Sequence, residues 1–96
     1  MDKLHSSATD KLFKAILSLK SVDECYSFFG DACTIREIEE ISQRFEVARL
    51  LDEGELNYNK IREATGASTA TITRINKCLH YGNDGYRIAI DRLKED

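Results

Sequence analysis

The chain has 96 residues, of which 42% are hydrophobic and 32% charged, a composition that favours one folded domain over a disordered or fibrous protein. No apolar run is long enough to cross a bilayer, and the N-terminus lacks the apolar core of a secretory signal, so we expect a cytoplasmic location. Cys25, Cys33 and Cys78 lack the spacing of zinc ligands, so we expect reduced thiols and no bound metal.

The formal net charge of −3 would argue against nucleic acid if the charges were evenly spread, but they are not. Residues 1–56 hold seven basic and twelve acidic side chains, whereas residues 57–80 hold four basic side chains and one acidic one. The four basic residues are Lys60, Arg62, Arg74 and Lys77. An acidic body behind a positive segment is compatible with DNA binding and would limit non-specific attraction to phosphates.

Apolar residues in the N-terminal half recur at helical spacing without an interrupting proline, which predicts an all-α fold. A first helix carries an apolar stripe from Leu12 to Leu17. Capping boxes at residues 21–24 and 34–37 predict the starts of a short second helix and of the longest helix, which reaches about Glu53. We expect the inward face of the longest helix to carry Ile35, Ile38, Ile41, Phe45 and Ala48.

Three further helices are predicted in the C-terminal half, at about residues 57–66, 68–79 and 84–94. Residues of the types that begin and end helices mark their boundaries. These are Gly54 and Gly66 just after helices, and Asn57 and Ser68 as N-caps. No linker or repeat divides the chain, so we predict a single helical domain over residues 1–96.

The segment Tyr58–Leu79 has the pattern of a helix-turn-helix. Gly66 lies at the turn, where the lack of a Cβ permits a left-handed conformation. Ile61, Ile72 and Ile75 fall at offsets that would lock the two helices together. An ordinary helical hairpin with a glycine turn remains the alternative. Hydroxyl residues crowd the start of the second helix although threonine is a mediocre helix former, which favours the DNA-binding motif.

The second helix of this motif would enter the major groove with small, hydrogen-bonding side chains at its N-terminal end. The candidates for contact with the groove are Ser68, Thr69, Ala70, Thr71, Thr73 and Arg74. Their hydroxyls can reach base edges, and their methyl groups can touch thymine. We expect Arg62 and Lys77 to bind flanking phosphates, and Arg74 also lies close enough in sequence to contact one. The sequence thus predicts a DNA-binding transcriptional regulator whose partner is double-stranded DNA.

The chain resembles the Trp repressor family over roughly residues 8–94, and Ala70-Thr71-Ile72-Thr73-Arg74 is the most specific part of that resemblance. Residues 41–54 and 80–86 are similar to the YerC/YecD group of Trp-repressor-related proteins. The resemblance implies a six-helix Trp-repressor-like fold and a repressor function. It also implies an intertwined homodimer built by helices at about residues 8–53, with reading heads spaced for major grooves about 34 Å apart.

The resemblance further implies an effector pocket, because the family repressor senses tryptophan between its core and its reading head. Thr34, Arg44 and Arg74 match positions that line this pocket, with the two arginines flanking the indole. The family has glycine directly after the second arginine, whereas this chain has Ile75, whose branched side chain would fill the space of the indole. We therefore expect no tryptophan cofactor. Arg44 could instead pair with Glu40 or Asp52.

The sequence shows no catalytic constellation, since it lacks a metal-ligand pair, a phosphate-binding glycine loop and a nucleophile elbow. We therefore do not expect an enzyme. The competing interpretation is a helical dimeric protein-interaction module that retains the fold without binding DNA, which the acidic balance favours. Cys78 is expected to pack on the inner side of the second motif helix.

Overall fold

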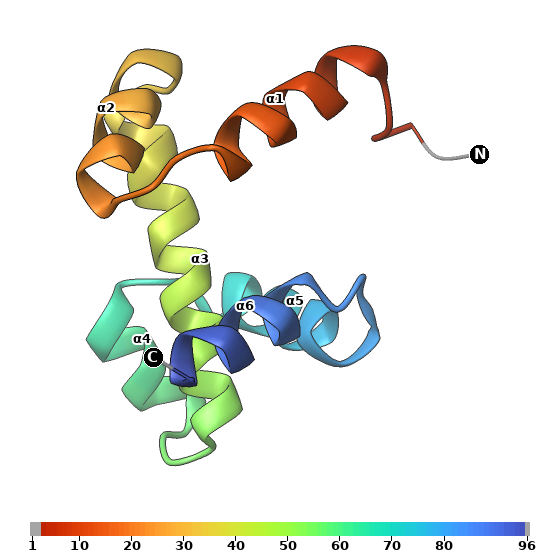
Figure 1. Ribbon diagram of the computed structural model, residues 1–96. Coiled ribbons are helices and arrows are strands. Elements are labelled where there is room, and N and C mark those ends of the chain that lie inside the picture. The colour runs from red at the N-terminus through yellow and green to blue at the C-terminus, as the bar shows by residue number, and fades with distance from the viewer. Residues whose placement is uncertain (1–2, 96) are drawn as a thin grey trace. The chain divides into compact units, whose positions relative to one another are not determined.

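The computed structural model describes residues 3–95, and these residues form six α-helices and no strand (Figure 1). They divide into two compact units, and the boundary falls inside the third helix, between Ile38 and Glu39. Each unit is therefore described by itself. Within the described residues, no helix is long and apolar enough to cross a membrane.

The N-terminal unit contains α1 (Ser7–Leu17), α2 (Val22–Ala32) and the first turn of α3 (Ile35–Glu53). Side-chain caps begin all three helices, because the first N–H groups of a helix have no partner within it. The hydroxyl of Ser6 accepts from the N–H of Thr9 at 3.0 Å, and Ser21 accepts from Glu24 at 3.1 Å. The Ser21 contact confirms the predicted start of α2, although the carboxylate of Glu24 accepts from the N–H of Lys20 and not from that of Ser21.

The second predicted capping box is reciprocal. The hydroxyl of Thr34 accepts from the N–H of Glu37 at 3.1 Å, and the carboxylate of Glu37 accepts from the N–H of Thr34 at 2.8 Å. Thr34 therefore fixes the start of α3 through a contact within three residues.

The N-terminal unit has well-formed helices but no fully buried side chain among its described residues. Phe28 and Phe29 form an edge-to-face pair with ring centroids 5.1 Å apart, and both rings are half-buried. Most of the larger apolar side chains of α1 and α2 are exposed. Exposed ones include Leu12, Phe13, Leu17, Val22 and Tyr26.

The predicted inward face of α3 is correct in part, and Ile38 is half-buried in its first turn. Ala48 is fully buried and Phe45 is half-buried against the core. Ile35 and Ile41 were expected to face inward, but they are exposed, Ile35 by 78%. The prediction fails at Ile35 and Ile41 because the described part of the chain leaves both uncovered, and helical periodicity cannot tell which neighbour is present.

The C-terminal unit packs α4 (Tyr58–Thr65), α5 (Thr69–Tyr81) and α6 (Gly85–Lys94) around the C-terminal part of α3 (Figure 1). Nine buried apolar side chains form its core. They are Val47, Ala48, Leu50, Ile61, Ala67, Ile72, Ile75, Leu79 and Ile90. Every helix of this unit contributes to that list, so the whole unit shares one core.

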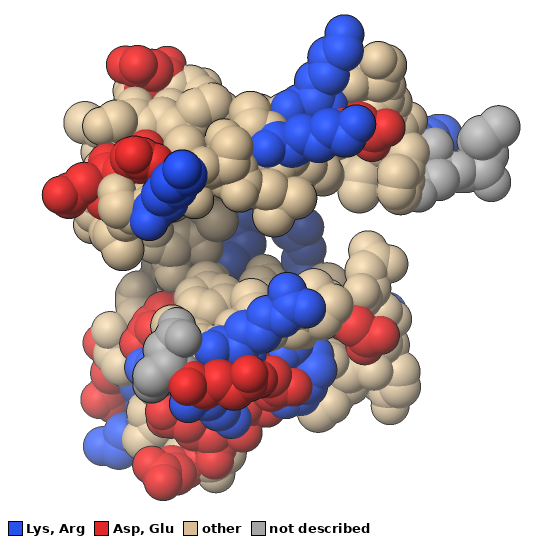
Figure 2. Space-filling view, viewed as in Figure 1, with Lys and Arg blue, Asp and Glu red and all other residues tan. Residues whose placement is uncertain are grey.

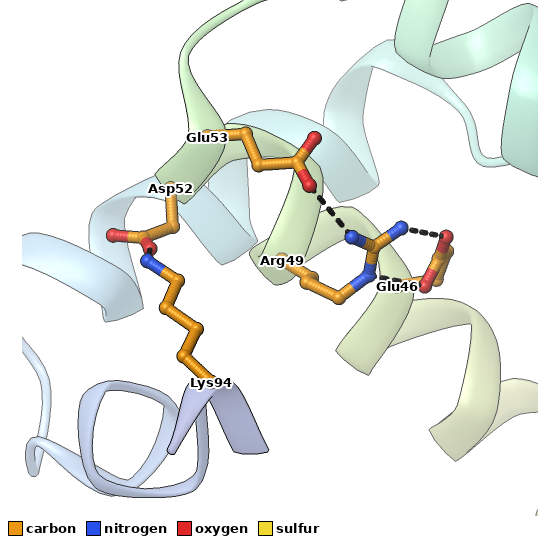
Figure 3. Close-up of polar contacts among 5 residues, drawn as sticks. All are labelled: Glu46, Arg49, Asp52, Glu53 and Lys94. Carbon is orange, nitrogen blue, oxygen red and sulfur yellow. Dashed lines mark hydrogen bonds and ion pairs between the residues drawn. The ribbon is translucent and has the colours of Figure 1, made fainter. Parts of the chain in front are cut away.

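Asp52 near the end of α3 joins this helix to α6 (Figure 3). Its carboxylate accepts from the Nζ of Lys94 at 2.7 Å and from the Nη1 of Arg87, and its side chain is only 10% exposed. The hydrogen bonds from Lys94 and Arg87 lower the pKa of Asp52 below its usual value. Residues 42 positions apart are thereby held together at the edge of the core.

A second ion-pair cluster lies along α3 itself (Figure 3). The guanidinium of Arg49 binds Glu46 at 2.6 Å and Glu53 at 2.7 Å. The hydrogen bond from Arg49 lowers the pKa of Glu46, and the same bond raises the pKa of Arg49. These are local i,i+3 and i,i+4 pairs on a partly exposed surface, so each contributes little to the stability of the fold.

Candidate nucleic-acid interface

The segment predicted as a helix-turn-helix folds as α4 and α5 joined by a turn at Gly66, Ala67 and Ser68. Gly66 has φ of +77°, the left-handed conformation expected for a glycine just after a helix. Its N–H donates to the carbonyl of Arg62 at 2.8 Å. A side chain at this position would be strained by the backbone angle, which explains why the chain has glycine there.

Apolar side chains lock the two helices together as the sequence predicts. Ile61 of α4 and Ile72 of α5 are fully buried, and Ile75 is 3% exposed. Ala67 in the turn is buried beside them. Because α4 and α5 share these contacts on their inner side, the opposite side of α5 is left facing outward.

Ser68 caps the start of α5. Its hydroxyl accepts from the N–H of Thr71 at 3.1 Å and donates to the hydroxyl of Thr71 at 3.0 Å. Thr71 is half-buried. These two hydroxyls therefore take part in fixing the start of α5, and the capping role of Ser68 agrees with the sequence analysis.

The outer face of α5 is formed by five exposed residues. They are Thr69, Ala70, Thr73, Arg74 and Lys77. Residues four apart in a helix lie above one another, so these five form two adjacent rows on one face. The first turn of α5 contains no acidic residue, nor does the rest of the helix. The face thus combines small polar side chains with two cations.

Arg62 is the cation of α4 closest in sequence to the turn, and it is exposed. Its Nη2 donates to the side-chain oxygen of Asn59 at 3.4 Å, a long contact that leaves most of its donors available for another acceptor. By contrast, the visible face of the C-terminal unit in Figure 2 interleaves acidic and basic side chains.

Residues that match the family's effector pocket have contacts of their own. The Nε of Arg44 donates to the backbone carbonyl of Glu40 at 3.3 Å, one turn earlier in α3. Arg74 is exposed, and the neighbouring Ile75 belongs to the buried core. Thr34 acts as the N-cap of α3. The carboxylate of Asp52, considered as a partner for Arg44, is instead bound by Arg87 and Lys94.

Two features of this region differ from the sequence analysis. Cys78 is exposed, so its predicted inward packing is wrong. Cys78 lies one turn after the exposed Arg74, whereas Ile75 and Leu79 take the buried side of α5. It lines an open hollow with Gly82, Asn83, Gly85 and Tyr86. Sequence reasoning also missed Gln43, whose amide contacts the turn between α4 and α5. Its partner is 22 residues away, so no local pattern could have shown the contact.

Comparison with known proteins gives consistent matches over nearly the whole chain. Residues 7–94 match the family described as Trp repressor protein. The chain is 58% identical to the protein YerC of Bacillus subtilis (strain 168), over 99% of this chain and 90% of that protein. None of the proteins compared here is described as an enzyme.

Two solved structures share the fold. A TrpR-like protein from Eubacterium eligens has a TM-score of 0.91 at 58% identity, covering 96% of this chain and 94% of that one. A candidate Trp repressor from Staphylococcus aureus has a TM-score of 0.90 at 45% identity, covering 98% of this chain and 93% of that one. With its six helices and a family match over most of its length, the chain belongs to the Trp repressor family, a family of regulators.

Proposed function

We propose that this protein is a transcriptional regulator, with repression as its expected action, that binds DNA through α4 and α5. The observation that carries the proposal is the outer face of α5, where small side chains and two cations are exposed. The opposite side of α5 packs against α4 through buried isoleucines, which hold that face outward. A helix of this kind suits the major groove, because small side chains allow the backbone to approach base edges. DNA binding would take place in the cytoplasm.

Different residues of the interface would have different tasks. Thr69, Ala70 and Thr73 are exposed near the start of α5 and would contact base edges. Arg62, Arg74 and Lys77 would bind phosphates on either side. Ser68 and Thr71 were also expected to reach DNA. Their mutual hydrogen bonds favour a supporting role, with the exposed hydroxyl of Ser68 still able to meet a phosphate.

The chain would act as a homodimer built by α1, α2 and the first half of α3. Large apolar side chains on these helices are exposed, including Tyr26 at 72% and Ile35 at 78%. An apolar surface of this extent is unusual on a small monomer and is typical of an interface between chains. A twofold dimer would present two copies of α5 to successive major grooves.

Matched tyrosine variants test the dimer. Tyr26→Glu places a charge in the proposed interface and should weaken self-association by about tenfold or more in sedimentation equilibrium. Tyr81→Glu changes a tyrosine that is 85% exposed and lies outside that interface, so it should leave association unchanged. A wild-type protein that sediments as a monomer at micromolar concentration would contradict the proposal.

Tryptophan is not proposed as the effector. The family position that leaves room for the indole is Ile75 in this chain, and its side chain is part of the buried core. A core residue cannot be displaced without opening a cavity. Calorimetric titration with L-tryptophan should give no heat at micromolar concentrations, and DNA affinity should be the same with and without the amino acid. Micromolar binding at Arg44 and Arg74 would overturn this part of the proposal.

Selection of bound duplexes from a random pool, followed by affinity measurements at several salt concentrations, tests DNA binding directly. Phosphate-driven binding should lose about 0.9 log units of affinity per tenfold increase in salt for each phosphate contact. Thr73→Val should relax the sequence preference, whereas Lys77→Ala should weaken all duplexes and lower the salt slope by about 1.

The main alternative is a helical protein-interaction module, which the net charge of −3 and the exposed apolar helices favour. It predicts a folded dimer that enriches no duplex and shows no salt-dependent affinity for any DNA. That result would contradict the proposed DNA-binding function while leaving the dimer intact.

A further inference from the structure

Gln43 of α3 makes a directional contact with the last residue of α4, directly before the turn that leads to α5. Its Nε2 donates to the backbone carbonyl of Thr65 at 3.0 Å, and the pair is partly buried. Thr65 is the last residue of α4, and the final carbonyls of a helix have no partner within the helix. The side chain of Gln43 on α3 therefore supplies the hydrogen-bond donor that the carbonyl of Thr65 lacks within α4.

The other polar contacts of Thr65 and Gly66 lie within α4 and the turn. The hydroxyl of Thr65 donates to the carbonyl of Ile61 at 2.8 Å and accepts from the N–H of Ala67 at 3.1 Å. The N–H of Gly66 donates to Arg62. These bonds close the turn on itself, but they do not fix its orientation on α3.

Apolar packing also holds the turn to α3, but this packing is non-directional. Ala67 shares the core with Val47 and Ala48, and such contacts tolerate small rotations. A hydrogen bond weakens steeply as its angle and length change. The amide of Gln43 lies directly beside Gly66, where a Cβ would come within 3.7 Å of Nε2. Gln43 is thus placed to fix both the position and the direction of the turn.

We propose that Gln43 is a positioning residue that sets the orientation of α4 and α5 on α3. It belongs to the body of the protein and carries no charge, so it would act on DNA affinity through the geometry of the reading head. The effect on DNA rests on the proposed function, whereas the effect on the turn does not. The two can therefore be tested separately.

The first test needs no DNA. Gln43→Glu keeps the shape of the side chain but turns a carboxylate toward the carbonyl of Thr65, while Gln43→Met removes the donor at similar length. In both variants, hydrogen exchange at the amides of Gly66 and Ala67 should become faster by about tenfold or more, with Ile90 in the core unchanged. Glu39→Gln, an exposed change one turn earlier on α3, is the control and should leave all rates unchanged.

The second test uses the selected duplex. Gln43→Met should weaken DNA binding by about tenfold and leave the salt slope at its wild-type value, because no phosphate contact is lost. Lys77→Ala should change the slope instead. If DNA binding fails for the wild type, the exchange result still decides whether Gln43 orders the turn.

Wild-type exchange rates of the Gly66 and Ala67 amides in Gln43→Glu and Gln43→Met would overturn the proposal. Should both variants fail to fold, the wild-type protein gives the answer. The side-chain amide protons of Gln43 should then exchange with solvent several times more slowly than those of the exposed Asn83. Equal rates for the two amides would also overturn the proposal.

Discussion

The two units of the chain form helices equally well but differ in how they bury apolar side chains. Serine or threonine caps begin α1, α2 and α3, and an asparagine and a serine cap α4 and α5. The C-terminal unit nevertheless buries nine apolar side chains, whereas the described part of the N-terminal unit buries none. Helix formation and core formation are thus separate requirements, and the N-terminal unit meets only the first within one chain.

The largest expected effect is on the free energy of unfolding, and it is found by shortening one isoleucine to alanine in each unit. Ile72→Ala should lower the free energy of unfolding by about 2 to 5 kcal/mol, because it leaves a cavity in the core of the C-terminal unit. Ile35→Ala removes a side chain that is 78% exposed, so in a dissociated chain it should cost little. Urea unfolding followed by circular dichroism measures both variants.

Protein concentration sharpens this comparison. If a partner covers Ile35, Ile35→Ala should shift the dimer–monomer equilibrium measured by sedimentation, and its cost in unfolding should grow with protein concentration. Equal and concentration-independent costs for Ile35→Ala and Ile72→Ala would contradict the difference between the two units.

A smaller effect is expected at the turn between α5 and α6. A Cβ on Gly82 would clash with the backbone carbonyl oxygen of Cys78, which cannot move away without disturbing the end of α5. Gly82→Ala should therefore destabilise the C-terminal unit by about 1 to 3 kcal/mol in urea unfolding. Gly85→Ala meets nothing within 4 Å and serves as the control. A neutral Gly82→Ala would show that this turn adjusts freely.

Local signals made the helices and the turn between α4 and α5 predictable from sequence. The side chains of Asn57 and Ser68 cap the starts of α4 and α5, and Gly66 takes the left-handed conformation just after α4. Such caps and turns depend on only a few neighbouring residues, so a local sequence pattern predicts them. The burial of Ile61 and Ile72 follows from helical periodicity in the same way.

Contacts between distant residues were not predictable. Gln43 and Thr65, or Asp52 and Lys94, meet only after the helices have packed, so neither pattern nor propensity identifies the pairs. Ile35 and Ile41 have the periodicity of core residues, yet both are exposed in the described part of the chain. The periodicity indicated an apolar face correctly but could not indicate which chain covers it.

Acid should weaken the link between α3 and α6. The pKa of Asp52 is lowered in the folded state, so its ion pairs stabilise the fold fully above the unfolded value of about 3.9. That stability is lost as the pH falls through the lower, folded pKa. Asp52→Asn should lower the urea midpoint at pH 7, and the difference from wild type should shrink as the pH drops below about 4.

Glu46→Gln is the matched control for this pH series. The pKa of Glu46 is also lowered, by Arg49, but Glu46 is 47% exposed and its partner lies three residues away on the same helix. Its effect should be within about 1 kcal/mol and should depend on salt. An effect of Glu46→Gln as large as that of Asp52→Asn would contradict the view that Asp52 holds α6 in place.

The smallest expected effect is a gain in stability, and it concerns the N-terminal unit. Gly30 lies inside α2, where glycine costs about 0.5 to 1 kcal/mol relative to alanine because the unfolded chain is more flexible. A Cβ at Gly30 meets nothing within 4 Å in the single chain, so Gly30→Ala should raise the melting temperature by a few degrees. A loss would mean that a second chain packs closely against Gly30, since only a close neighbour could turn an open position into a crowded one. In that case sedimentation of Gly30→Ala should show weaker association, whereas a gain in stability with unchanged association would place Gly30 outside the interface.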